Sequence, residues 1–119
     1  MNRQDAAQLF DERRHALELD AESRAYAESL VCDVAARINS LDRTIATLAP
    51  AWPVSQMARL DVAILRIAIA EIDGGEVPPP VAISEAVELA KRYCTEGARR
   101  MINGALGTYV RRNAQNLQT

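Results

Sequence analysis

The sequence is poor in the residues that build catalytic and metal sites. Its 119 residues include two cysteines, one histidine and 4% aromatic residues. His15 lies between an arginine and an alanine on a helix face that we expect to be solvated, which favours a surface residue over a general base. Cys32 and Cys94 lie far apart without metal-site spacing, so we expect reduced, buried thiols. The sequence therefore predicts no enzyme, no metal and no cofactor.

Two other groups of residues have ordinary explanations. Glu85 and Glu88 are at helical spacing, but no histidine or third acid accompanies them, so we interpret them as exposed charge. Gly74-Gly75 lacks the lysine and following hydroxyl residue of a phosphate-binding loop. We interpret this pair as the end of a helix.

Long apolar runs and a strong net charge are also missing. The longest apolar run, 62–70, contains Arg66 and is much shorter than the roughly 20 residues that a membrane span needs. No leader-like start is present, so we expect a cytoplasmic protein without membrane contact. The net charge is −2 and the isoelectric point near 5.4, so the overall field does not attract nucleic acid. Any RNA binding needs a local basic patch or a basic partner.

What the sequence does contain is apolar residues at helical spacing. With 49% hydrophobic and 25% charged residues, it predicts one folded domain over residues 1–119. No segment alternates with a period of two, so the fold class is all-α, with five or six helices and no sheet. The predicted helices cover residues 4–19, from 26 to a break near 39, from there to 48, 55–72, from the prolines at 78–80 to 94, and 97–112.

The middle of the chain carries the strongest turn signals. Pro50 and Pro53 enclose Trp52 in a rigid connector, and we expect this indole to be substantially buried between the two halves of the protein. Ser55 is a favourable N-cap for the helix that follows. The positions of that helix that we expect to face inward are Met57, Leu60, Ile64, Ile67 and Ala68.

Several short motifs follow one another in a fixed order. They are Leu65-Arg66-Ile67-Ala68-Ile69-Ala70-Glu71, then Val81-Ala82-Ile83-Ser84-Glu85-Ala86-Val87-Glu88-Leu89-Ala90-Lys91-Arg92-Tyr93, and then Met101-Ile102-Asn103-Gly104-Ala105-Leu106. Together with the Trp52 connector, this order resembles the NusB family of transcription antitermination factors. The resemblance implies an all-helical fold of two small packed bundles, here with the N-terminal one reduced. It also implies binding to the ribosomal protein NusE, with which members hold boxA RNA so that polymerase resists termination.

The candidate binding residues are mostly cations near two helix ends. Arg99 and Arg100 open a helix, where the helix dipole disfavours them, so we predict that they face RNA phosphates. Lys91 lies at the end of the preceding predicted helix. Its position there has two competing explanations, a favourable interaction with the helix dipole and contact with an RNA phosphate. Met101 stands where the family has phenylalanine. Glu71 is at the position that the resemblance places against NusE, and a simple exposed helix end is the competing explanation.

Two further positions near these cations have structural interpretations. For Asn103 we favour the capture of a buried backbone group over an RNA contact. Gly104 inside a helix favours a closely crossing neighbour. The helix dipole accounts for Arg111 and Arg112 at the end of the last predicted helix.

The sequence departs from the family where RNA would bind. Arg3 is the only arginine of a segment that is arginine-rich in the family, Met101 stacks poorly on a base, and Gly97 replaces an acid or amide. We therefore expect weak RNA binding by the protein alone. Two functions remain: a NusB-like factor that acts with NusE, boxA-type RNA and the transcription elongation complex, or a divergent NusB-fold interaction protein that has lost RNA recognition.

The N-terminal part also predicts self-association. Only the helix at 4–19 precedes the apolar stripe of Leu30, Val34 and Ile38, and one short helix covers part of it. Exposed aliphatic side chains cost about 1.5 to 3 kcal/mol each, and such a patch usually marks an interface. We expect a homodimer, or an exchange of N-terminal helices, that buries Phe10, Leu17, Leu30 and Val34.

Overall fold

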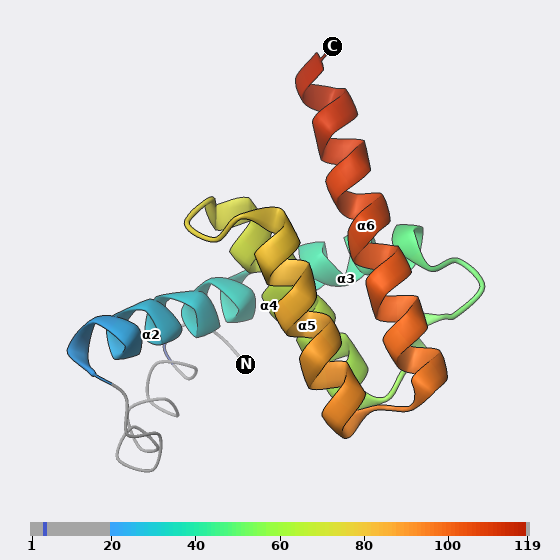
Figure 1. Cartoon of the computed structure of the whole chain (residues 1–119), viewed down its shortest axis with the longest axis horizontal. Helices are drawn as coiled ribbons and strands as arrows, with labels where there is room; N and C mark the ends of the chain where they lie inside the picture. The colour runs from blue at the N-terminus through green and yellow to red at the C-terminus, as the bar shows by residue number, and fades with distance from the viewer. Residues whose placement is uncertain (1–3, 5–19, 119) are drawn as a thin grey trace. The chain divides into compact units, whose positions relative to one another are not determined.

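The structure of the protein, a computed structural model, describes residue 4 and residues 20–118. Within this part, five α-helices and one 3-10 turn form the fold, and no strand occurs (Figure 1). The elements are α2 (Ala21–Ala36), α3 (Ile38–Leu48), η1 (Val54–Gln56), α4 (Arg59–Gly74), α5 (Pro79–Tyr93) and α6 (Glu96–Gln118). The all-α prediction is confirmed. The expectations for Arg3, Phe10, His15 and Leu17 fall outside the described residues.

Internal contacts divide the chain into two compact units, residues 1–38 and 39–119. The prediction of a single domain over 1–119 stays a prediction. In the first unit, α2 begins after Asp20, whose Oδ1 accepts a hydrogen bond of 2.7 Å from the backbone N–H of Ser23. This hydrogen bond is the main reason why the pKa of Asp20 is lowered. Cys32 is buried, and Leu30 and Val34 are half-buried.

The predicted break near Asn39 is confirmed within two residues. The backbone N–H of Arg37 donates to the carbonyl oxygens of Asp33 and Val34, and α3 begins at the next residue. Arg37 also pairs with Asp33 across one helical turn, with 3.1 Å between Nη1 and Oδ2.

In the second unit, α4, α5 and α6 pack against one another (Figure 1). The core holds aliphatic side chains from α3, α4 and α6, each worth about 1.5 to 3 kcal/mol when fully buried. The largest of these are Leu41, Ile45, Leu65, Ile69, Ile102 and Leu106. Within 96–114, the buried positions of α6 all lie between Ala98 and Leu106, so its first half makes the packing surface.

The prediction that Ser55 caps a helix is wrong. Ser55 lies inside the 3-10 turn, and α4 begins at Arg59 after the N-cap residue Ala58. The cap comes from Asp61, whose Oδ2 accepts a hydrogen bond of 3.3 Å from the backbone N–H of Ala58. Asp61 is only 4% exposed, and a carboxylate in this position is favoured by the positive end of the helix dipole.

The predicted inward face of this helix is partly wrong. Met57, Ile64 and Ala68 are buried, but Leu60 and Ile67 are 43% and 37% exposed. The fully enclosed positions are instead Leu65 and Ile69. Because α4 is apolar around almost its whole circumference, the sequence pattern does not specify which stripe its neighbours cover.

The connection to α5 agrees with its turn signals. Gly75 ends α4 with φ of 76°, a left-handed conformation that glycine adopts without strain. Prolines then occupy the first turn of α5, where a missing N–H costs no helical hydrogen bond. Ile83 and Val87 are half-buried, and the fully buried stripe is Ala82, Ala86 and Ala90.

Trp52 is half-buried, which is less than we predicted. It lies against the first turn of α6: a Cβ built on Gly97 would be 3.7 Å from Cη2 of the indole. Trp52 and Gly97 belong to the same unit, so this contact fixes the connector to α6. In the described part of the chain, no helix is long and apolar enough to cross a membrane.

Candidate nucleic-acid interface

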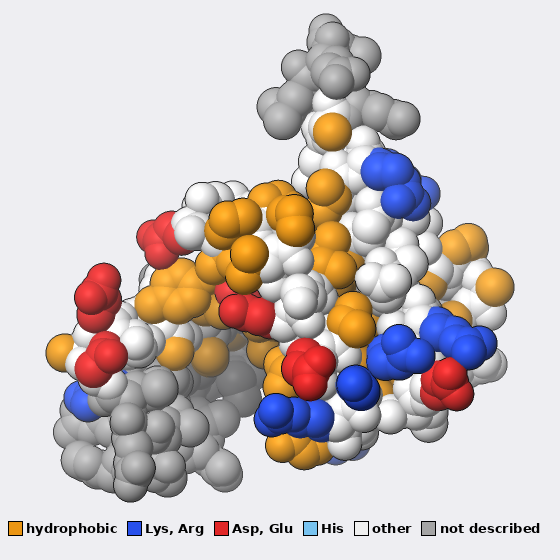
Figure 2. All heavy atoms as spheres, viewed as in Figure 1, with side chains coloured by type: hydrophobic (Ala, Val, Ile, Leu, Met, Phe, Trp, Pro, Cys, Tyr) orange, Lys and Arg blue, Asp and Glu red, His pale blue; other side chains and the backbone are white. Residues whose placement is uncertain are grey.

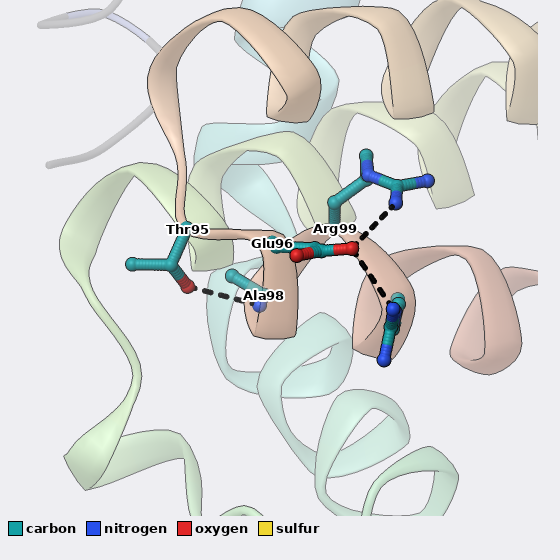
Figure 3. A network of polar contacts seen from close by, with 5 residues as sticks. Thr95, Glu96, Ala98 and Arg99 are labelled. Atoms are coloured by element: carbon teal, nitrogen blue, oxygen red, sulfur yellow. Dashed lines mark hydrogen bonds and ion pairs between the residues drawn. The ribbon is translucent and has the colours of Figure 1, made fainter.

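Four cations lie on either side of the turn between α5 and α6, and we call Lys91, Arg92, Arg99 and Arg100 the basic turn. The first two are in the last turn of α5, and the others follow the start of α6. The turn itself is short because Thr95 caps α6: its Oγ1 accepts a hydrogen bond of 3.0 Å from the backbone N–H of Ala98 (Figure 3). Figure 2 shows lysine and arginine side chains gathered where α5 ends and α6 begins.

Glu96 pairs with both arginines of the basic turn, Arg99 (Figure 3) and Arg100. Its Oε1 lies 2.8 Å from Nη2 of Arg100 and 3.6 Å from Nη2 of Arg99. The side chains of Glu96 and Arg100 are 67% and 73% exposed, so the pair adds little stability and opens readily. An acid in the first turn is also favoured by the helix dipole and offsets the cost of the arginines.

This finding weakens our reason for selecting Arg99 and Arg100, since their placement is no longer costly. The sequence analysis missed Glu96, although its spacing of three and four residues from the arginines is the signal of such pairs. The arginines remain at the surface, with a carboxylate that a phosphate can displace.

Lys91 and Arg92 differ from these arginines. Both are exposed, and neither has an ion-pair partner among the described residues. Their place in the last turn of α5 is favourable for cations through the helix dipole. They are therefore the two cations of the basic turn that form no ion pair with a described acid.

The middle of α6 does not match its predicted structural roles. Asn103 is exposed, so its side chain does not satisfy a buried backbone group. Gly104 is exposed too, and a Cβ there would meet no atom within 4 Å, so none of the described helices crosses closely. Both predictions were wrong because the buried face of α6 passes through Ile102, Ala105 and Leu106 instead. Met101 is half-buried beside this face.

Arg111 and Arg112 do not lie at a helix end, because α6 continues to Gln118. The dipole explanation for this pair was therefore wrong. Arg112 instead donates hydrogen bonds to Thr47 at the end of α3, of 3.0 Å to Oγ1 and 3.3 Å to the backbone oxygen. It joins α6 to α3.

Glu71 is separated from the basic turn. It lies in the last turn of α4, half-buried, where the chain turns towards the beginning of α5. The basic turn follows the other end of α5, a helix of 15 residues. A partner at Glu71 and an RNA strand at the basic turn would thus use opposite ends of α5.

Cys94 lies in the turn itself, where it is half-buried and not buried as predicted. Burial, followed by a hydrogen bond to Asp61, raises the pKa of the Cys94 thiol to about 11. Thiols react as thiolates, so this cysteine is a poor nucleophile at neutral pH. Among the residues that the structure describes, no cluster of three or more His, Cys, Asp or Glu side chains could hold a metal ion.

The described fold and surface define an all-helical protein with a cationic turn and no metal-binding cluster in its described part. The chain belongs to the NusB family, because the family model described as "NusB family" matches residues 1–111. The transcription antitermination protein NusB of Roseiflexus sp. strain RS-1 is 46% identical over 110 residues, which are 90% of this chain and 74% of that protein.

Other relatives are similar over shorter parts. The transcription antitermination protein NusB of Thermoanaerobacter sp. strain X514 is 38% identical over 90 residues, 76% of this chain and 64% of that protein. The aligned part of this chain thus spans less than two thirds of that relative's length. Among solved structures, T. maritima NusB matches with a TM-score of 0.71 and 21% identity, covering 89% of this chain and 85% of that one. This match shows the fold.

Proposed function

We propose that the protein is a transcription antitermination factor of the cytoplasm, without catalytic activity. It binds boxA-type RNA together with the ribosomal protein NusE and modulates termination by RNA polymerase in the elongation complex. Membership of the NusB family and the name shared by its relatives support this function. The structural observation that carries it is the exposed basic turn, which is a local patch on a chain of net charge −2.

We propose that the RNA strand binds at one end of the second unit. Arg99, Arg100 and Lys91 contact phosphates, and Met101 lies beside them on α6. Arg3, outside the described residues, adds a cation from the N-terminal segment. Glu71, at the opposite end of α5, faces the NusE-type partner.

RNA binding by the protein alone is expected to be weak. The cations are few, and Glu96 must release two of them before they contact phosphates. Their contribution comes from counterion release, so affinity falls steeply with salt. A basic partner protein would supply the remaining charge.

The experiment is titration of labelled boxA RNA at several salt concentrations, with and without NusE. Changing Arg99 and Arg100 to alanine should weaken binding and flatten the plot of log affinity against log salt. Losing two phosphate contacts on a single strand lowers this slope by about 1.4. The matched control changes Arg43 and Arg111 to alanine, which removes the same charge from two exposed positions outside the basic turn. If both double variants bind like the parent, the patch has been misassigned.

A second function is favoured by three details of the site. Glu96 already occupies the two arginines, Met101 is half-buried, and Gly97 offers no side chain. They fit a NusB-fold interaction protein that no longer recognises RNA. In the same titration, this alternative predicts binding to NusE without binding to boxA RNA under any salt condition.

A further inference from the structure

The side chain of Tyr93 is more exposed than the other large apolar side chains of the described part of the chain. Its exposed fraction is 65%, against 37% to 44% for the other large exposed hydrophobic side chains in the described part of the chain, Leu60, Ile67, Val81 and Leu89. Trp52, Tyr26 and Tyr109 are half-buried, and the hydroxyl of Tyr109 donates to Asp73. Tyr93 is therefore the most accessible aromatic ring among residues 20–114.

The position of Tyr93 follows from the end of α5. The buried stripe of this helix, Ala82, Ala86 and Ala90, repeats every four residues, and the half-buried Cys94 follows as the C-cap residue. Tyr93 lies three residues after Ala90, about 60° around the helix from it, and is the last residue of α5. Tyr93 thus stands at the end of the helix, next to the turn, where its side chain is exposed.

The ring lies within the basic turn. Lys91 and Arg92 directly precede it, and Arg99 and Arg100 follow after the cap of α6. Glu96 is the one acid between residues 89 and 118. An accessible ring among cations is the arrangement that binds unpaired nucleotides, since bases stack on the ring while cations hold the phosphates.

We propose that Tyr93 is the stacking surface for one unpaired base of a single-stranded RNA whose phosphates Lys91 and Arg92 hold. This inference rests on the proposed function and adds a contact to it. Tyr93 also provides an aromatic ring in a chain whose Met101 replaces the family phenylalanine. Met101 is a half-buried thioether that presents no ring to a base. The four surrounding cations favour a polyanion over an apolar protein surface as the occupant.

The test is fluorescence anisotropy of the full chain with labelled single-stranded boxA RNA. Tyr93→Leu removes the ring but keeps an apolar side chain, and Tyr93→Phe keeps the ring. The leucine variant should bind about 5- to 100-fold more weakly, the range that loss of one stacked base produces. The phenylalanine variant should bind within about twofold of the parent. Leu89→Ala, on the same helix and 44% exposed, is the matched control and should change nothing.

Two readouts separate stacking from a general loss of binding. Tyr93 carries no charge, so its removal should leave the salt slope unchanged, whereas Lys91→Ala with Arg92→Ala should lower that slope by about 1.4. Replacing RNA bases one at a time with abasic sites should reveal one position where the parent loses affinity and Tyr93→Leu does not. Circular dichroism and the melting temperature check that each variant is folded.

Each outcome decides the proposal. If the parent binds RNA and Tyr93→Leu binds equally well, the stacking role is overturned and the proposed function stands. If Tyr93→Leu instead loses only NusE binding, the ring belongs to a protein interface and the proposal is wrong. If the parent binds no RNA with or without NusE, this inference and the proposed function both fail.

Discussion

Arg66 of α4 and Asp42 of α3 form a two-point ion pair. Nε of Arg66 lies 2.8 Å from Oδ1 of Asp42, and Nη2 lies 2.7 Å from Oδ2. The hydrogen bonds to Asp42 raise the pKa of Arg66 above its ordinary value, so the arginine stays charged. The pair explains why an arginine interrupts the apolar run of α4: it joins that helix to α3 at the edge of the core.

We expect Arg66→Lys to lower the free energy of unfolding by about 1 to 2 kcal/mol, because an ammonium group cannot form both parallel hydrogen bonds. Urea unfolding followed by circular dichroism measures the change. Arg43→Lys, on an exposed position of α3, is the control and should have no effect. An unchanged midpoint for Arg66→Lys would show that the pair contributes nothing measurable.

We expect the free energy of unfolding of the protein to fall at high pH because of the Cys94 thiol. Its pKa is about 11 in the folded protein against an ordinary value of 9.0, so the folded state holds this proton more tightly. The stabilisation is complete below about pH 9 and disappears as pH rises towards 11. Urea unfolding of the parent and of Cys94→Ala across this range should show a steeper fall for the parent. If the free energy of unfolding falls equally with pH in both proteins, the prediction is wrong.

We also expect the Cys94 thiol to be alkylated slowly. Site-resolved mass spectrometry after iodoacetamide treatment at pH 8 should find Cys94 modified more slowly than a free thiol of ordinary pKa. Asp61→Asn removes the negative charge that contributes to the raised pKa, so it should speed alkylation. A rate that Asp61→Asn leaves unaltered, in a protein that is still folded, would exclude this carboxylate as a cause.

Gly104→Ala should stabilise the protein by about 1 kcal/mol. Glycine costs roughly this much inside a helix, and a Cβ at this exposed position would meet nothing within 4 Å. Gly107→Ala is the matched comparison on the same helix. There the Cβ would lie 3.3 Å from Nη1 of Arg111, so the gain should be smaller. Thermal unfolding of both variants tests the order, and a lower melting temperature for Gly104→Ala would contradict it.

The half-buried Leu30 and Val34 of α2 leave self-association as a prediction. Sedimentation equilibrium should find a homodimer at tens of micromolar, and Phe10→Asp, at a position outside the described residues, should disrupt it. Leu89→Asp, on an exposed position of α5, should leave the dimer intact. A parent protein that remains monomeric at this concentration would rule out the dimer.

The sequence predicts helices well where proline and glycine mark their ends, as before α5 and after Gly75. It predicts the start of α4 poorly because Asp61 provides the cap from inside the helix. Ion pairs within one helix, such as Glu96 with Arg100, could be found from their spacing. The partners of Arg66 and Arg112 could not, since Asp42 and Thr47 lie 24 and 65 residues away along the chain.

The cap of α6 by Thr95 has a consequence for recognition. The hydrogen bond from Ala98 to Thr95 fixes the start of α6 directly after the end of α5. The backbone that carries Lys91, Tyr93 and Arg99 is thereby preorganised before any ligand arrives. A rigid surface of this kind loses less conformational entropy on binding than a mobile loop. Each of its few cations can therefore contribute more to the net free energy of binding.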